Sequence, residues 1–127
     1  YYDKGLQADS TNAFICNNYS YFLSLKDARL DFALDLARRA TRLSPNNPTY
    51  LDTYAWVLYR MGRYEEARVP MRQAVSLDRS DNPELMIHYG DILYALNDRF
   101  MASFYWKKAL ENGYDAQEIE KRLKQLE

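Results

Sequence analysis

The chain repeats at a step of 35 residues, and this period constrains its fold more than any other feature. Asn47 follows Asn12 by 35 residues, and Asn82 follows Asn47 by the same number. Further columns keep the step: Tyr19, Tyr54 and Tyr89; Ser20, Ala55 and Gly90; Leu23, Leu58 and Leu93; and Cys16, Leu51 and Met86. A repeat of roughly 20–50 residues is typical of arrays in which each unit buries its apolar face on its neighbours, so the period predicts an elongated stack.

Each unit contains two segments with helical periodicity. In the second unit, apolar and small side chains recur at a helical spacing and give each segment one apolar face. They are Leu51, Tyr54, Ala55 and Leu58 in the first segment, and Tyr64, Ala67, Met71, Ala74 and Val75 in the second. Asn47-Pro48 and Asn82-Pro83 each place an N-cap residue before a proline that fits the first helical position. Gly62 and, in the third unit, Asn97 tolerate the left-handed backbone of a tight turn between helices.

The first unit is one residue longer than the second between its two segments. The alanine columns of the second segments are Ala33, Ala67 and Ala102, and Ala40, Ala74 and Ala109, with steps of 34 and then 35 residues. The extra residue is expected in the loop around residues 26–29. The predicted units are therefore residues 12–44, 47–79 and 82–112.

Both ends of the chain carry partial units. Residues 1–9 resemble a second segment whose first segment is missing, which suggests a piece of a longer protein. Tyr1, Tyr2 and Leu6 are then expected to expose apolar surface that favours self-association. Residues 115–127 are predicted to form a capping helix that starts at a capping box, Asp115 to Glu118. Its apolar stripe is Ala116, Ile119, Leu123 and Leu126, and its predicted solvated face contains Glu118, Lys121, Arg122 and Lys124.

The composition excludes several classes of function. The charges nearly cancel, with 17 Lys and Arg against 18 Asp and Glu, so no electrostatic footprint for nucleic acid is present. No apolar run approaches the roughly 18 residues that a membrane-spanning helix needs, so we expect no membrane insertion of this stretch. A single cysteine, Cys16, rules out an internal disulfide and leaves the redox compartment open.

These columns resemble the tetratricopeptide repeat (TPR). The match in the second unit is Leu51, Tyr54-Ala55, Leu58, Gly62, Tyr64, Ala67 and Ala74, and in the third it is Gly90, Leu93, Ala102, Trp106 and Ala109. The first unit matches at Tyr19-Ser20, Leu23, Leu30, Ala33, Ala40 and Pro45. Arg79, Met71 and Arg99 depart from the family pattern. The resemblance implies an all-α, right-handed α-solenoid of antiparallel helix pairs, with three full repeats, a leading half repeat and a C-terminal capping helix.

The resemblance also implies where a partner binds. First helices of TPR units line a concave face, and peptides or partner proteins bind there. The residues predicted to bind a partner are Asn17, Tyr21, Asp52, Trp56, Tyr59, Arg60, Ile87, His88, Asp91 and Tyr94. Aromatic side chains and arginine are enriched at interaction hot spots, although Tyr21, Trp56 and Tyr59 would also suit packing between units.

One TPR subtype is excluded by the residues at these positions. Chaperone-binding TPRs hold a C-terminal carboxylate with lysine and asparagine. Asn17 and Tyr21 take those places here, and Thr49 and Arg60 do not restore the clamp. No binding of acidic chaperone tails is expected.

No catalytic centre, cofactor or metal site is predicted. Cys16 and the only histidine, His88, belong to units one and three, which are not neighbours in a stack. Cys16 is predicted to lie in the core and His88 on the surface. Phosphate loops, paired metal ligands and nucleophile elbows are absent from the sequence. The chain is predicted to be a protein-binding scaffold and not an enzyme.

Two alternatives remain open at this stage: an accessory region of a larger enzyme, such as a glycosyltransferase or protease, and a structural, self-associating module. Similarity to bacterial TPR proteins slightly favours the periplasmic side of the cell envelope, as a lipoprotein, over the cytoplasm.

The column of small residues, which we call the small column, gives a first testable prediction. Ser20, Ala55 and Gly90 are expected where the two helices of a unit cross, because a larger side chain would force the backbones apart. Ala55→Leu should therefore lower the free energy of unfolding by about 1–3 kcal/mol through overpacking. A thermal melt that matches wild type would contradict this position for Ala55.

Overall fold

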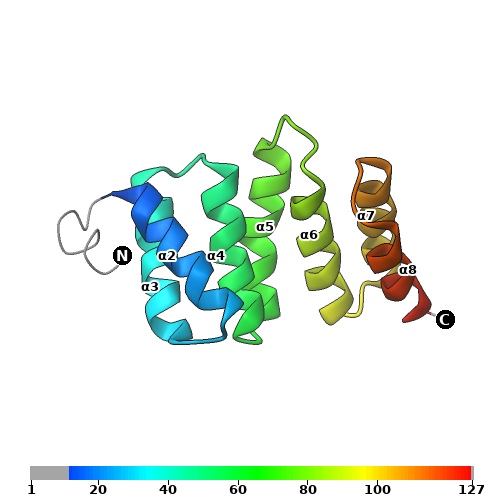
Figure 1. The fold of residues 1–127 in the computed structure, drawn as a ribbon, viewed down its shortest axis with the longest axis horizontal. Helices are drawn as coiled ribbons and strands as arrows, with labels where there is room; N and C mark the ends of the chain where they lie inside the picture. The colour runs from blue at the N-terminus through cyan, green and yellow to red at the C-terminus, as the bar shows by residue number, and fades with distance from the viewer. Residues whose placement is uncertain (1–11, 127) are drawn as a thin grey trace.

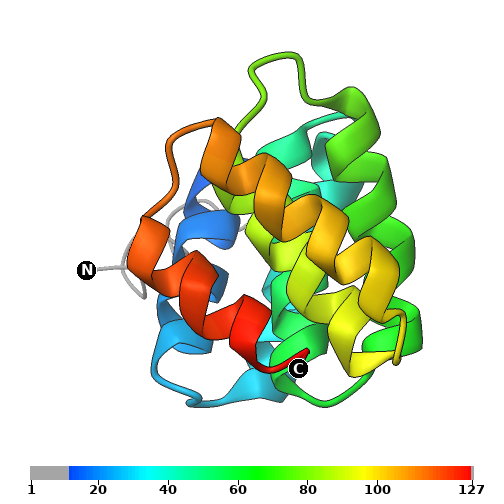
Figure 2. The same ribbon diagram turned by 90° about the vertical axis from the view of Figure 1, so that its right-hand side faces the viewer.

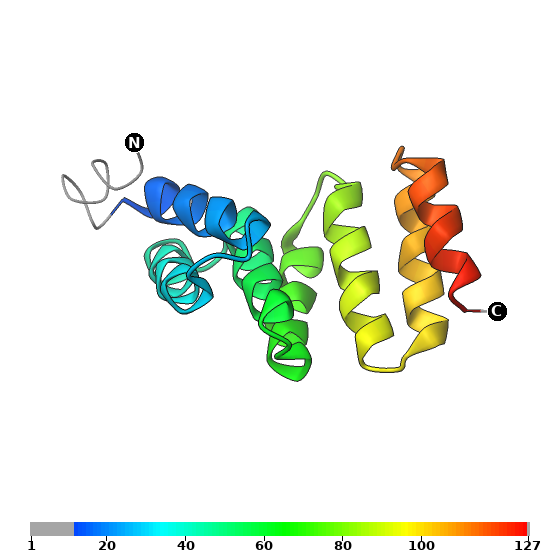
Figure 3. The ribbon, with the colours of Figure 1, turned by 60° about the horizontal axis from the view of Figure 1, so that its bottom comes forward.

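The computed structural model describes residues 12–126, and they fold into helices joined by short turns (Figure 1). The helices are α2 (Ala13–Leu25), α3 (Leu30–Leu43), α4 (Pro48–Arg60), α5 (Tyr64–Leu77), α6 (Pro83–Ala95), α7 (Arg99–Glu111) and α8 (Ala116–Lys124). Helices α2 and α3, α4 and α5, and α6 and α7 form the three pairs, which follow one another along the long axis, with α8 at the end (Figures 1 and 3). The predicted all-α solenoid is confirmed. The leading half repeat at residues 1–9, with the self-association assigned to it, lies outside the described residues.

The predicted asparagine caps start all three first helices. Asn12 Oδ1 accepts a hydrogen bond from the Ile15 amide at 3.1 Å, and Asn47 Oδ1 accepts from the Thr49 amide at 2.9 Å. Asn82 Oδ1 accepts from the Glu84 amide at 3.0 Å. Each side chain satisfies an amide that would otherwise lack a helical partner.

The turns between paired helices also follow the sequence prediction. Gly62 has φ of +79° and Asn97 has φ of +66°, so both adopt the left-handed backbone that a tight turn requires. The extra residue of the first unit lies in its turn, which spans residues 26–29 and has left-handed Asp27 and Arg29, each with φ of +50°.

The two helices of a unit cross at the small column. Ser20, Ala55 and Gly90 are all buried. Ser20 Oγ donates a 2.7 Å hydrogen bond to the Ala33 carbonyl of the paired helix α3. At the equivalent place, a Cβ on Gly90 would lie 3.3 Å from the Ala102 carbonyl of α7 and 2.5 Å from the Trp106 ring. Close backbone approach is thus the common geometry of these crossings.

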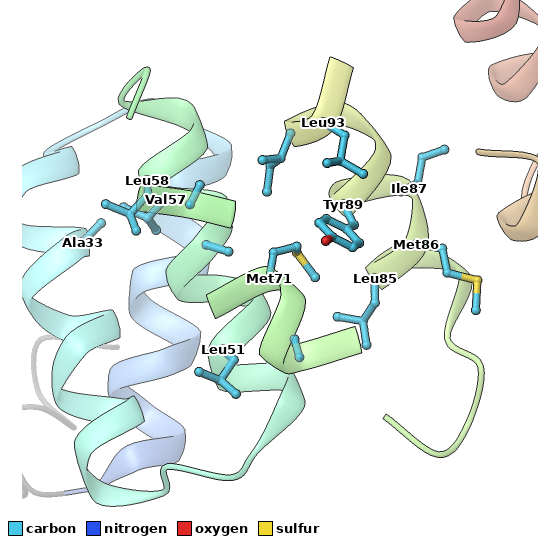
Figure 4. Close-up of a cluster of buried hydrophobic side chains, with 14 of the residues drawn as sticks. Ala33, Leu51, Val57, Leu58, Met71, Leu85, Met86, Ile87, Tyr89 and Leu93 are labelled. Atoms are coloured by element: carbon cyan, nitrogen blue, oxygen red, sulfur yellow. The ribbon is translucent and has the colours of Figure 1, made fainter. Parts of the chain in front are cut away.

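The apolar core runs continuously through the stack. Its members come from every described helix. Figure 4 shows part of it, where Met71 of α5 lies near Leu85 and Tyr89 of α6, and Leu51 and Leu58 of α4 lie on the other side of the second unit. Cys16 is completely buried in this core, as predicted. No described helix has the length and apolar character needed to cross a membrane.

The helix contacts define which side of the stack is concave. Helix α4 contacts both α2 and α6, whereas α3, α5 and α7 do not contact one another. Because the first helices lie closer together than the second helices, the stack curves toward α2, α4 and α6. We call the partly exposed surface of these three helices the inner face.

Gly90 provides a stability test of the helix crossing. Gly90→Ala places a methyl group against the ring of fully buried Trp106 and should lower the free energy of unfolding by about 1–3 kcal/mol, as measured by denaturant unfolding. Trp106→Phe serves as the partner in a double-mutant cycle, because a smaller ring should relieve part of the clash. Strictly additive costs in the cycle would count against direct contact between residues 90 and 106.

Candidate functional site

The residues predicted to bind a partner fall into an exposed and a buried set. Tyr21, Asp52, Trp56, Tyr59, Asp91 and Tyr94 are half-buried on the inner face, and Arg60 is exposed at the end of α4. In contrast, Asn17, Ile87 and His88 are only 5%, 1% and 9% exposed. The prediction that His88 lies on the surface is wrong, and Asn17 and Ile87 offer a partner almost no area.

The physical reason is the position of these side chains between successive units. Asn17, Asp52 and Ile87 share one column, and the exposed fraction of the Asp52 side chain is only 14%. This column is therefore largely covered in all three units, because the first helices contact one another across it. Exposure is greater one turn further along the first two helices, at Tyr21 and Trp56, whereas the Asp91 side chain in the same column of α6 is only 11% exposed.

A stack of rings joins α4 to α6 on this surface. The rings of Trp56 and Tyr59 are nearly parallel, with centroids 4.7 Å apart, and Trp56 also stacks on the His88 imidazole at 4.0 Å. Since each ring contacts its neighbours, these side chains restrict one another's rotamers.

His88 owes its charge state to Asp52. Its Nδ1 atom lies 2.8 Å from Asp52 Oδ1, and both side chains are almost buried. Burial lowers the pKa of His88, but the charge and hydrogen bond of Asp52, helped by Asp91 and Glu84, outweigh it and raise the pKa above 6.5. The pairing with Asp52 across the α4–α6 boundary therefore favours the imidazolium form of His88 relative to a free histidine side chain.

Asp91 lies where three helices meet. Trp106 Nε1 of α7 donates a 3.0 Å hydrogen bond to its Oδ1 atom. Arg122 of α8 forms a two-pronged ion pair, with Nε 2.8 Å from Oδ1 and Nη2 3.1 Å from Oδ2. The prediction that Arg122 belongs to a solvated face is wrong, because its guanidinium turns inward to this carboxylate. The hydrogen bond with Asp91 raises the pKa of Arg122 above its already high usual value.

A cleft of about 340 Å³ lies beside this ion pair. Its lining comes from α4, α6, α7 and α8: Tyr59, Asp91, Tyr94, Trp106, Glu118, Lys121, Arg122 and Gln125. The contributions of Trp106 and the α8 residues were not predicted. Trp106 occupies an ordinary core position in the repeat, and no spacing in the sequence pairs Arg122 with Asp91.

Arg60 has a structural partner of its own. Its guanidinium pairs with Asp27, in the turn between α2 and α3, through two hydrogen bonds. Acid–base pairs thus join each unit to the next: Asp27 to Arg60, Asp52 to His88, and Asp91 to Arg122. These pairs fix how neighbouring units are placed relative to each other.

Two polar side chains of α2 on the inner side of the first unit, Tyr21 and Asn17, are half-buried and buried, respectively. Burial, followed by the charges of Glu84 and Asp52, raises the pKa of the Tyr21 phenol, which indicates that both acids act on α2. Asn17 Oδ1 is buried and has no hydrogen-bond partner. Within residues 12–126, no group of His, Cys, Asp and Glu side chains could hold a metal ion.

Comparisons with known proteins agree with the helix-pair architecture. No family model matches the chain. A TPR repeat-containing protein of Pseudomonas aeruginosa is 34% identical over 80 residues, which span 63% of this chain but only 13% of that relative. Among solved structures, pilF of Pseudomonas aeruginosa superposes with a TM-score of 0.77 and 24% identity over 93% of this chain and 53% of its own. The first TPR of Spaghetti (RPAP3), bound to an HSP90 peptide, gives a TM-score of 0.81 and 22% identity over 92% of this chain and 91% of its own.

The His88–Asp52 pair predicts how stability depends on pH. Because folding raises the pKa of His88, the pair contributes its full stabilisation below the unfolded pKa near 6.5 and loses it as pH rises through the folded pKa. Wild type should lose free energy of unfolding across this range, whereas Asp52→Asn should show a flatter profile and cost about 1–3 kcal/mol at pH 6. Chemical denaturation from pH 6 to 8.5 measures both; parallel profiles for the two proteins would refute the assignment.

Proposed function

We propose that this chain, whose fold is that of tetratricopeptide-repeat proteins, binds a peptide or a segment of a partner protein along its inner face. The observation that carries the proposal is the row of half-exposed aromatic side chains on α2, α4 and α6: Tyr21, Trp56, Tyr59 and Tyr94. Aromatic side chains held rigidly at a concave surface lose little conformational entropy on binding, which is why they dominate interaction hot spots.

The polar contacts of this surface support binding over catalysis. Asp52, His88, Asp91 and Arg122 are engaged with one another in ion pairs that hold the helices together. No nucleophile with an adjacent base is among them. We therefore assign the inner face to recognition, whether the chain acts alone or within a larger protein.

The partner is proposed not to be an acidic chaperone tail. The peptide bound to the Spaghetti TPR belongs to HSP90, but the likeness to this chain, at 22% identity, concerns the fold alone. Here Asn17 is buried, Arg60 is paired with Asp27, and Asp52 and Asp91 place carboxylates on the inner face. Because Arg60, His88 and Arg122 are already paired with acids, an incoming carboxylate would have to compete with those acids for a cation.

The proposal is tested with a library of random short peptides. Wild type should enrich specific sequences, and the triple variant Tyr21→Ala, Trp56→Ala and Tyr59→Ala should lose at least about tenfold in affinity for them, since each anchor removed from an interface hot spot costs more than about 1 kcal/mol. Fluorescence polarisation with an enriched, labelled peptide measures the loss.

The matched control removes the same kind of area from the second helices. Val69, Phe100 and Phe104 are 56%, 78% and 48% exposed on α5 and α7. Their triple alanine variant should bind like wild type, and circular dichroism should show native helix content in both variants. Loss of binding in the control alone would move the site to the second helices.

A further inference from the structure

Helix α8 covers one end of the inner face through a small contact. It has nine residues, and Ile119 is its only buried side chain among those described. Figure 2 looks onto the end of the stack, where α8 lies at the front beside α7. A helix this short is not stable in isolation, so its structure depends on the contacts it makes with α6 and α7.

The polar part of that contact is concentrated on one carboxylate. Arg122 and Asp91 have side-chain exposures of 22% and 11%, and both oxygens of Asp91 accept from the guanidinium. Trp106 Nε1 of α7 donates to the same carboxylate, so Asp91 has a hydrogen-bond partner that does not depend on α8. Trp106 reaches this position because Gly90 has no Cβ to block its ring.

An almost buried carboxylate requires a cation. If the Arg122 guanidinium left it, Asp91 would keep the hydrogen bond from Trp106 but no opposite charge, which is costly wherever the carboxylate stays poorly solvated. A positively charged group that replaces the Arg122 guanidinium on Asp91 avoids this cost. A neutral or acidic group does not, so the site selects for positive charge.

The cleft and the aromatic rings beside Asp91 also restrict which side chains can lie next to the bound cation. The cleft of about 340 Å³ opens next to the Arg122–Asp91 pair and is flanked by the rings of Tyr59, Tyr94 and Trp106. Tyr59 also belongs to the ring stack of Trp56, so a chain bound along α4 and α6 would pass directly from the aromatic row to Asp91.

We propose that Asp91 is an exchangeable cation subsite, at which an arginine or lysine of a basic peptide segment displaces Arg122 together with α8. The partner's cation pairs with Asp91, and its flanking apolar side chains contact Tyr59 and Tyr94. This inference rests on the proposed function and specifies the chemistry of the segment that the inner face accepts. Helix α8 then acts as an internal competitor that lowers the apparent affinity of the free chain.

The test uses the full chain and the same random peptide library, selected in parallel on wild type, Arg122→Ala and Asp91→Asn. Arg122→Ala removes the competitor and leaves the carboxylate, so its selected peptides should be richer in arginine or lysine than those of wild type. A selected basic peptide should bind Arg122→Ala about tenfold more tightly than wild type, as expected when a closed state that blocks the site is depopulated. Asp91→Asn should still bind peptides through the aromatic row but should lose the enrichment of basic residues.

Two controls separate this inference from general damage. Arg122→Lys keeps the charge but loses the two-pronged geometry, and should give an intermediate affinity. Substituting glutamine for the basic residue of the selected peptide should abolish the difference between wild type and Arg122→Ala. Thermal melts establish that each variant retains the three helix pairs.

The possible failures are distinguishable. Equal affinity of wild type and Arg122→Ala, or selection of peptides without basic residues, would overturn the exchangeable subsite while leaving the inner-face function standing. The proposed function itself fails if no library peptide binds wild type, or if the aromatic triple variant binds the selected peptides as tightly as wild type does.

Discussion

The close approach of two helix backbones within each unit is the constraint from which the rest of the structure follows. Ser20, Ala55 and Gly90 allow this approach because their side chains are small or absent. In the third unit the consequence extends to the inner face. The space above Gly90 is filled by Trp106, whose indole N–H reaches through to Asp91. A packing requirement in the core thereby orients a carboxylate at the surface where α8 ends.

Charged pairs then determine how the units follow one another. Each of the three pairs described above joins an acid of one unit to a base of the next unit or of α8. Such pairs add little net stability when exposed, as for Asp27 and Arg60, but an almost buried pair becomes costly if one member is lost. The two almost buried pairs, Asp52–His88 and Asp91–Arg122, lie between successive first helices and α8, so they favour the observed placement of α4, α6 and α8.

Much of the fold was predictable from the period alone, whereas the exposure of individual side chains was not. The 35-residue step located the asparagine caps, the glycine turn at Gly62 and the small column, because each depends on local backbone geometry that recurs in every unit. The step also identified columns that share an environment, but it does not say whether that environment is solvent or a neighbouring helix. Asn17, Ile87 and His88 were assigned to the surface for this reason, and the contacts between first helices bury them. Arg122 was misplaced because α8 starts 33 residues after α6, so the period no longer aligns it with the inner face.

The central claim is that the first helices, and not the second, form the recognition surface. The most direct measurement is an NMR titration of the ¹⁵N-labelled chain with a library-selected peptide, followed at the backbone amides and at the two indole N–H signals. The account predicts shift changes concentrated on α4, α6 and α8, including the Trp56 indole in the ring stack and the Trp106 indole bonded to Asp91. Changes confined to α3, α5 and the outer side of α7, with both indole signals unmoved, would contradict it.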